Sequence, residues 1–186
     1  LALRNMPIDY GVIGEGEETM AELAGALINR EDKKNIKGLA FIDKDKKFIV
    51  TGARDYINDL DALPFPDYSG FNFEKWFPLM QYSNQFAPFE KHSLISYAEI
   101  AGSRSCPFKC TFCYHHLGQK YRQRSLDRIF AEIDYLVNNY KINFIYFLDE
   151  LFSVDHQRMM EFSRRIKKYG LIGWAGFFRV NDVNQE

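Results

Sequence analysis

Residues 142–150 read INFIYFLDE, and this stretch holds the feature from which the fold is inferred. From Phe144 to Leu148 every side chain is aliphatic or aromatic, and Asn143 is the one polar residue before the two acids. A strand without polar alternation is typical of a sheet buried on both faces, as parallel sheets are when helices cover them. Residues 142–148 are therefore predicted to form a buried strand.

Helical patterns flank this strand on both sides. Ser125 is an N-cap residue type at the start of a run with apolar residues at helical spacing. These apolar positions are Ile129, Phe130, Ile133, Leu136, Val137 and Tyr140. A second helix is predicted from about Asp155 to Tyr169, and Gly170 ends it. The strand thus lies between two predicted helices.

Further strands are predicted over residues 94–101 and 171–180. Strands that alternate with helices favour parallel strands joined by crossover connections, an α/β fold. In such sheets the chemistry gathers at the carboxyl ends of the strands. Three groups lie at or close to these ends, and they are predicted to converge on one rim: the cysteines 106–113, the pair Asp149 and Glu150, and Arg179.

The N-terminal part has a different pattern. A strand over residues 8–13 precedes a Gly-rich turn at Gly14 to Glu17 and a helix. One face of this helix is expected to pack on another element, and its apolar residues at helical spacing are Met20, Leu23, Ala24, Leu27 and Ile28. Two strand-like runs around residues 43–46 predict a hairpin. Residues 55–89 lack sustained periodicity and include Pro64 and Pro66, so they read as a connector packed on the protein surface.

Composition limits the classes of function. The chain has 186 residues and a formal charge of -1, which gives no basic footprint for nucleic acid. Its longest apolar segment, near residues 171–178, is far shorter than the roughly 18 to 20 residues that a bilayer requires. A soluble cytoplasmic protein is expected, without a membrane span. The chain starts and stops beside predicted strands, and we expect it to be a fragment of a longer polypeptide.

All three cysteines, Cys106, Cys110 and Cys113, lie in the stretch CPFKCTFCYHH. Three thiols leave one without a disulfide partner, and closely spaced cysteines in a cytosolic α/β protein are more often metal ligands. One possibility is zinc, with His115 or His116 as the fourth ligand. The other is an iron-sulfur cluster, in which three thiolates leave one iron open to a substrate or cofactor.

The C-x-x-x-C-x-x-C spacing within SRSCPFKCTFCY, placed after a strand, resembles the cluster loop of the radical S-adenosylmethionine superfamily. YRQRS at 121–125 and FLDELFS at 147–153 extend the resemblance. It implies that Cys106, Cys110 and Cys113 hold three irons of a 4Fe-4S cluster, and that S-adenosylmethionine chelates the fourth. An electron from the cluster would then release a 5′-deoxyadenosyl radical. The resemblance also implies an electron donor such as flavodoxin or ferredoxin.

The resemblance extends to residues that would contact S-adenosylmethionine: Phe112, Tyr114, Asp149, Glu150 and Arg179. The family usually carries Gly-Gly-Glu where this chain has Leu148, Asp149 and Glu150, which leaves open which carboxylate binds the methionyl ammonium. An acid at this rim suits an ammonium group. Arg179 has the geometry to bind a carboxylate as a fork.

Leu-Asp-Glu-x-Phe is similar to the version of this segment in the cobalamin-binding branch of the superfamily. The turn at residues 14–17 and LPFPDY at 63–68 agree, whereas an Asp-x-His-x-x-Gly segment does not occur. The implied organisation is the tail of a Rossmann-like cobalamin-binding domain at 1–54, a connector at 55–90, and the first half of a radical S-adenosylmethionine β/α barrel at 91–186. Cobalamin would bind in the full-length parent.

The implied activity is C-methylation of a small-molecule substrate or oxidative cyclisation, as in the anaerobic magnesium-protoporphyrin monomethyl ester cyclase. The isolated piece is expected to be inactive. Two other functions stay open. One is a methylthiotransferase, which would need a further N-terminal cluster domain and a basic C-terminal module. The other is a non-catalytic Cys3His zinc module.

Overall fold

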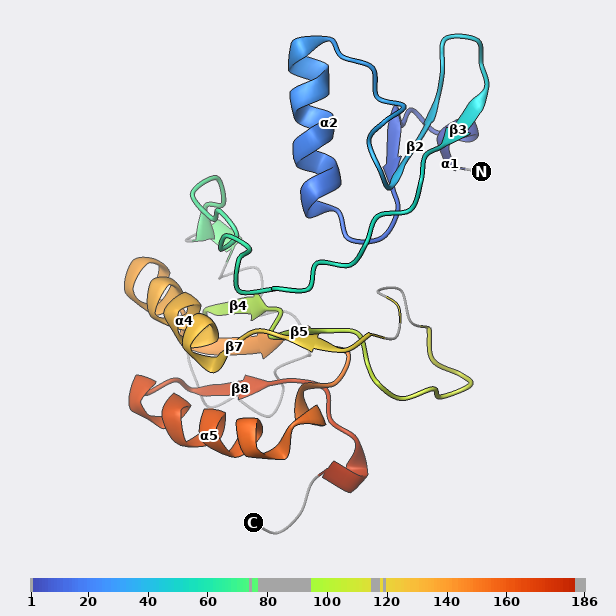
Figure 1. Cartoon of the computed structure of the whole chain (residues 1–186). Helices are drawn as coiled ribbons and strands as arrows, with labels where there is room; N and C mark the ends of the chain where they lie inside the picture. The colour runs from blue at the N-terminus through green and yellow to red at the C-terminus, as the bar shows by residue number, and fades with distance from the viewer. Residues whose placement is uncertain (1, 74, 77–94, 115–117, 119, 183–186) are drawn as a thin grey trace. The chain divides into compact units, whose positions relative to one another are not determined.

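The computed structural model describes residues 2–73, 75–76, 95–114, 118 and 120–182 (Figure 1). The chain divides into two compact units, Leu1–Asn58 and Asp59–Glu186. Within the described ranges, no helix combines the length and the apolar character that crossing a membrane requires. The structure does not test the expected domain boundaries after residues 54 and 90.

The first unit is a small antiparallel sheet covered by one long helix. After α1 (Ala2–Asn5), its strands β1 (Tyr10–Val12), β2 (Leu39–Ile42) and β3 (Phe48–Val50) pair in the order β1-β2-β3. Both pairs of strands are antiparallel. Helix α2 (Glu17–Asn29) packs on this sheet. The buried apolar core of the unit consists of Leu23, Ala26, Ile36, Leu39 and Phe41.

The hairpin predicted around residues 43–46 is confirmed, because the Asp43 carboxylate accepts hydrogen bonds from the backbone N–H groups of Asp45 and Lys47. The apolar face predicted for α2 is confirmed at Leu23 alone. The helix buries Thr19, Leu23 and Ala26, whereas three large apolar side chains stay exposed. These are Met20, Leu27 and Ile28. The expected assignment of this unit to the tail of a Rossmann-like cobalamin-binding domain stays a prediction, and its strands β1 and β2 pair antiparallel.

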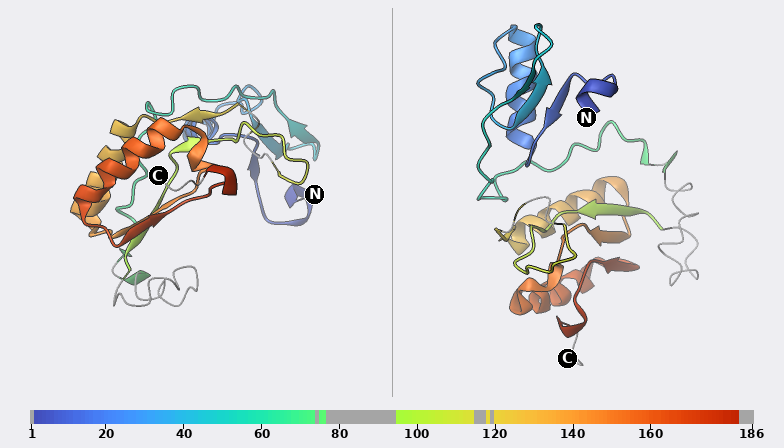
Figure 2. Two further views of the ribbon diagram at one scale, coloured as in Figure 1. Left: turned by 90° about the horizontal axis from the view of Figure 1, so that it is seen from below. Right: turned by 90° about the vertical axis from the view of Figure 1, so that its right-hand side faces the viewer.

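The second unit contains the predicted parallel sheet. Strands β4 (Tyr97–Ile100), β7 (Phe144–Phe147) and β8 (Gly173–Ala175) pair in the order β4-β7-β8, all parallel. Helix α4 (Leu126–Tyr140) connects the first two strands, and helix α5 (His156–Ile166) connects the last two. Both helices lie on one side of the sheet (Figures 1 and 2). The predicted α/β fold is confirmed for this unit.

The core of the second unit lies between this face of the sheet and the two helices. Alternate strand residues, such as Ile145 and Phe147, point into it, and Phe162 from α5 meets the Phe147 ring edge to face. The Phe147 ring centroid lies 4.3 Å from that of Phe152. Fully burying side chains of this size contributes about 2 kcal/mol each, so this cluster fixes the helices on the sheet.

The helix boundaries follow the predicted signals. Ser125 is the N-cap of α4, and its side chain accepts a hydrogen bond from the backbone N–H of Arg128. Asp155 caps α5 in the same way. The chain then makes one 3-10 turn, η3 (Lys167–Tyr169), and Gly170 ends it with φ 61°. This left-handed conformation is costly for other residues, which explains why Gly170 correctly predicted the end of the helix.

Strand β8 is much shorter than the predicted strand over residues 171–180. It ends at Ala175, because the following segment turns to pair with the loop after β7 instead of continuing the sheet. There the backbone N–H of Phe152 donates to the carbonyl of Phe177 at 3.0 Å. Arg179 therefore lies in a connection, just before the 3-10 turn η4 (Val180–Asp182).

Candidate functional site

The three cysteines lie on a loop that is closed by a small ribbon of two strands. Strand β5 (Ser103–Arg104) pairs antiparallel with β6 (Arg122–Gln123), and the cysteine loop runs between them. The cysteines were expected directly after the first strand of the sheet. The structure places Gly102 and β5 in between, so the loop has its own two-stranded base.

All three thiols are free of disulfides. Cys106 is half-buried, and Cys110 and Cys113 are exposed. The backbone N–H of Cys113 donates to the carbonyl of Cys110 at 3.1 Å, which bends the second half of the loop into a turn. Three accessible thiols on one short loop are a donor set that fits an iron-sulfur cluster.

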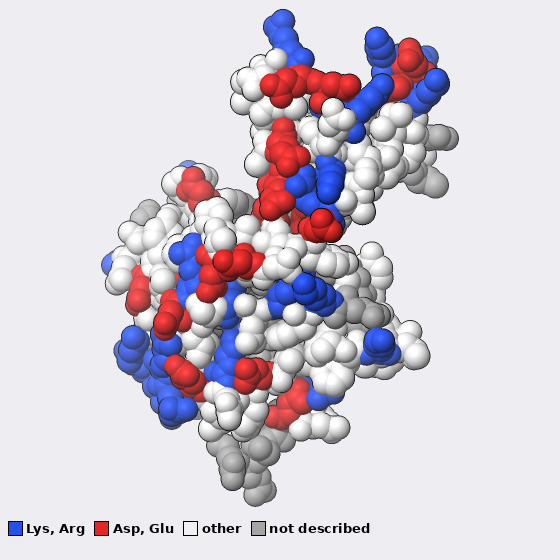
Figure 3. All heavy atoms as spheres, viewed as in Figure 1, with Lys and Arg blue, Asp and Glu red and all other residues white. Residues whose placement is uncertain are grey.

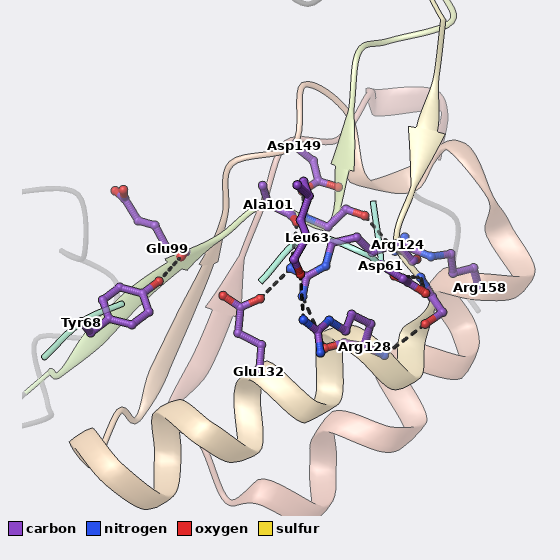
Figure 4. Close-up of polar contacts among 12 residues, drawn as sticks. Asp61, Leu63, Tyr68, Glu99, Ala101, Arg124, Arg128, Glu132, Asp149 and Arg158 are labelled. Atoms are coloured by element: carbon purple, nitrogen blue, oxygen red, sulfur yellow. Dashed lines mark hydrogen bonds and ion pairs between the residues drawn. The ribbon is translucent and has the colours of Figure 1, made fainter. Parts of the chain in front are cut away.

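The base of the loop is tied to the rest of the unit by a buried polar network. Asp149, just after β7, accepts hydrogen bonds from the Gly102 backbone N–H at 2.7 Å and from the Ser103 hydroxyl at 2.5 Å. Arg158 of α5 donates to the backbone carbonyls of Gly102 at 3.2 Å and Arg124 at 2.9 Å. One acid and one arginine thereby hold both ends of the loop (Figure 4).

This network explains why Asp149 is not open to a ligand. Asp149 is only 1% exposed. Burial raises the pKa of Asp149, and hydrogen bonds from Ser103 and Gly102 oppose that rise. Burial likewise raises the pKa of Tyr121, whose hydroxyl lies close to Ser103. The structure thus uses Asp149 as an internal support of the cysteine loop.

Glu150, the next residue, is placed differently. It is half-buried and lies close enough to Cys113 to act on it electrostatically. Loss of hydration raises the pKa of the Cys113 thiol, and negative charge on Cys110, Cys106 and Glu150 acts in the same direction. Of the two predicted acids, Glu150 is therefore the one whose charge acts on a cysteine thiol.

Arg179 also comes to the cysteine loop. Its guanidinium carbon lies 3.6 Å from the ring centroid of Phe108, which sits between the first two cysteines. Its nitrogens form a fork with Asp182, with Nη2 2.8 Å from Oδ1 and Nε 3.3 Å from Oδ2. The hydrogen bond to Asp182 raises the pKa of Arg179, and the negative charges of Cys106 and Cys110 add to this rise. The fork predicted for a ligand carboxylate is occupied by an internal one.

The two aromatic residues assigned to cofactor contact flank the last cysteine. Phe112 is 88% exposed and Tyr114 is 86% exposed. Exposed rings at this position offer flat apolar surface to a ligand, and their contact with S-adenosylmethionine stays a prediction. The possible zinc ligands His115 and His116 lie outside the described residues.

Contacts thus bring Arg179 to the cysteine loop and Asp149 to its base, whereas a functional role of these residues and of Glu150 stays a prediction. Among the residues with described positions, no three Cys, His, Asp or Glu side chains gather where a single metal ion would bind. A 4Fe-4S cluster distributes its ligands over separate irons, so this finding does not bear on it.

Sequence reasoning missed four residues that organise the site: Ser103, Phe108, Arg158 and Asp182. Ser103 and Phe108 lie within the recognised motif, and their positions between cysteines or at its start were the available signal. Arg158 and Asp182 carried no such signal, because only the fold brings Arg158 to the base of the loop and Asp182 to Arg179.

A separate open depression of about 620 Å³ lies near the first turns of α4 and α5. Arg124, Arg158 and Arg165 line it together with Asp61, Asp127 and Glu161, and none of the predicted site residues does. Acidic and basic side chains are also interspersed over the face of this unit that Figure 3 shows.

Comparison with protein families and with curated proteins gives relatives over nearly the whole chain. No family model matches. An uncharacterised methyltransferase of Pyrococcus horikoshii is 34% identical over 100% of this chain and 38% of its own length. The anaerobic magnesium-protoporphyrin IX monomethyl ester cyclase of Cereibacter sphaeroides is 30% identical over 96% of this chain and 28% of its own length. The chain therefore spans about a third of the length of the relatives that it matches.

Solved structures match the fold. The radical S-adenosylmethionine methyltransferase TsrM from Kitasatospora setae, with cobalamin and a [4Fe-4S] cluster bound, has a TM-score of 0.61 at 19% identity over 87% of this chain and 30% of that chain. The cobalamin-dependent S-adenosylmethionine radical enzyme OxsB has a TM-score of 0.57 at 20% identity over 83% of this chain and 20% of that chain. The chain is thus related in sequence to a methyltransferase and to magnesium-protoporphyrin cyclases, and its fold matches part of cobalamin-dependent radical S-adenosylmethionine enzymes.

Proposed function

We propose that this chain carries the cluster-binding and S-adenosylmethionine-binding part of an enzyme that methylates an unactivated carbon or closes a ring oxidatively. The observation that carries the proposal is the cysteine loop itself. Its three free thiols stand on a ribbon at the carboxyl ends of parallel strands, and the charge of Glu150 acts on Cys113. Catalytic groups gather at this edge of a parallel sheet.

In this proposal Cys106, Cys110 and Cys113 hold three irons of a 4Fe-4S cluster, and the fourth iron stays open to the amino and carboxylate groups of S-adenosylmethionine. When bound, the cluster would supply the electron that cleaves the sulfonium and gives a 5′-deoxyadenosyl radical. The neighbouring residues of the site would then bind and orient S-adenosylmethionine or support the cysteine loop.

Glu150 is the carboxylate that we assign to the methionyl ammonium. Asp149 is too buried for this task, and both of its oxygens already accept hydrogen bonds from the base of the loop. A carboxylate beside an ammonium forms a charge-assisted hydrogen bond, which is stronger than a neutral one. Asp149 instead supports the loop that presents the thiolates.

Phe112 and Tyr114 would cover part of the bound S-adenosylmethionine, since their rings are exposed on the same loop. Members of the family that resemble this chain act on small molecules, and the match to TsrM is to a structure with a tryptophan substrate. Cobalamin and the substrate contacts belong to the full-length parent in this proposal. An electron donor such as flavodoxin or ferredoxin would reduce the cluster, and a cytoplasmic location fits this chemistry.

The test is anaerobic reconstitution with iron and sulfide, followed by metal analysis and electron paramagnetic resonance of the reduced protein with and without S-adenosylmethionine. About four irons per chain and a spectrum that S-adenosylmethionine perturbs are expected. The triple variant with Cys106, Cys110 and Cys113 changed to Ala should hold none. Bound zinc in place of iron, or a cluster indifferent to S-adenosylmethionine, would overturn the proposal.

A matched pair of variants tests the role of Glu150. Glu150→Gln should keep the cluster and lose at least tenfold in affinity for S-adenosylmethionine, because the charge-assisted bond to the ammonium is lost. Glu161→Gln removes an exposed carboxylate on α5 and should bind as the parent does. Equal affinities for all three proteins would assign the ammonium to another group.

A further inference from the structure

Arg179 is held at the centre of a chain of side-chain contacts that runs from the loop after β7 to the cysteine loop. At one end, the Ser153 hydroxyl of η2 (Phe152–Val154) donates to Asp182 at 2.5 Å. Asp182 forms the fork with the Arg179 guanidinium. At the other end, that guanidinium lies over the ring of Phe108.

The support behind Arg179 is well ordered by its own contacts. The Asp182 side chain is only 13% exposed, and its backbone N–H donates to the Arg179 carbonyl at 2.9 Å. Ser153 is buried. A forked pair with a carboxylate fixes the plane of a guanidinium as well as its position. The face of the guanidinium is therefore held in place for stacking before any ligand arrives.

Phe108 is the matching surface on the cysteine loop. It lies between Cys106 and Cys110, in the longer of the two intervals of the motif. A guanidinium 3.6 Å from the ring centroid is well within the range of a cation-π contact. This contact ties the first half of the loop to η4, whereas Asp149 and Arg158 hold only its base.

We propose that Arg179 is a positioning residue that latches the Cys106–Cys110 half of the loop through Phe108, with Asp182 and Ser153 as its support. The inference rests on the proposed function only in naming the loop as the cluster loop. It gives Arg179 an internal role in place of the ligand-carboxylate role, because its fork is already formed with Asp182.

The latch can be tested in the metal-free chain, independently of any cofactor. Trypsin cuts after Lys109, an exposed residue next to Phe108, and mass spectrometry follows that one bond under reducing conditions. Arg179→Gln and Phe108→Leu should each speed cleavage there by about three- to tenfold, as expected for loss of one cation-π contact. Arg164→Gln, on the exposed side of α5, is the matched control and should change nothing.

Coupling between the two residues separates a latch from a general structural role. Since both variants break the same contact, the double variant should be cut no faster than the faster single one. Rates that multiply, or an Arg179→Gln protein cut as slowly as the parent, would overturn the inference. The proteolysis test does not depend on whether the chain assembles a cluster.

A second readout uses the reconstituted protein. Arg179→Gln should release iron to a chelator about three- to tenfold faster than the parent, while its affinity for S-adenosylmethionine changes by less than threefold. The opposite pattern, with unchanged iron release and affinity lowered at least tenfold, would return Arg179 to the role of ligand-carboxylate fork. If the parent protein does not bind iron, the proposed function is refuted, whereas the conclusion from proteolysis is unaffected.

Discussion

The carboxylate of Asp149 accepts a hydrogen bond from the backbone N–H of Gly102 at 2.7 Å, across 47 positions of sequence. The two residues follow the carboxyl ends of neighbouring parallel strands, β7 and β4. The same carboxylate takes the Ser103 hydroxyl. A buried acid thus joins the ends of these two strands at the base of the cysteine loop, in addition to the backbone hydrogen bond from Leu148 to Ile100.

Asp149→Ala should therefore lower the free energy of unfolding by about 2 to 4 kcal/mol, because two buried donors lose their acceptor. Urea denaturation followed by circular dichroism measures this. Asp149→Asn retains one acceptor oxygen and should cost less. Gln157→Ala, an exposed position on α5, serves as the control, and a loss for Asp149→Ala no larger than for Gln157→Ala would contradict the assignment.

Gly102 is predicted to tolerate no side chain. A Cβ there would lie 3.2 Å from Ile129 Cδ1 and 3.3 Å from Asp149 Oδ2, both in packed surroundings. Gly102→Ala should lower the free energy of unfolding by about 1 to 3 kcal/mol through overpacking. Gly70→Ala, where a Cβ would meet nothing within 4 Å, should leave the same denaturation curve unchanged. Equal curves for the two variants would show that the loop base adapts freely.

The sequence predicted the second unit well because its signals are local. Ser125, Asp155 and Gly170 mark helix ends by their own chemistry, and the apolar run from Phe144 marks a buried strand. The parallel order of the strands follows from the alternation of helix and strand. These features depend on neighbours in sequence, so no knowledge of distant contacts was needed.

The errors arose where distant contacts decide. The continuation of β8 was lost because Phe177 pairs with Phe152, a partner 25 positions away. The apolar stripe of α2 was misplaced because Thr19 is buried through its hydrogen bond to the Lys37 carbonyl. In the candidate site, the spacing of the cysteines was enough to identify them. The separate roles of Asp149 and Glu150 could be assigned only once the burial of each side chain was known.

Arg124 and Glu132 form a pair that is predicted to be costly to break. Arg124 Nη1 lies 2.6 Å from Glu132 Oε2, and the carboxylate side chain is 2% exposed (Figure 4). Glu132→Ala should lower the free energy of unfolding by about 3 to 5 kcal/mol, since it leaves a buried guanidinium without its counter-charge. Urea denaturation of the double variant Arg124→Met, Glu132→Met should recover much of that loss. A double variant as unstable as Glu132→Ala would contradict this account.

The pH dependence of stability should reveal Asp182. Hydrogen bonds from Arg179 and Ser153 lower the pKa of Asp182 from 3.8 to about 2. A lowered pKa in the folded state means that the charged form stabilises the fold above the unfolded pKa. That contribution is lost as pH falls through the window from about 4 to about 2. Allowing for solvent screening, it amounts to about 1 to 2 kcal/mol.

Subtracting the denaturation free energy of Asp182→Asn from that of the parent isolates this contribution. The difference should be about 1 to 2 kcal/mol at pH 6 and should shrink toward zero near pH 2. Ser153→Ala removes the second of the two supports, so its own difference from Asp182→Asn should be smaller and should vanish at a higher pH. A difference that stays constant across the range would mean that Arg179 and Asp182 are not paired in solution, and the latch on Phe108 would lose its support with them.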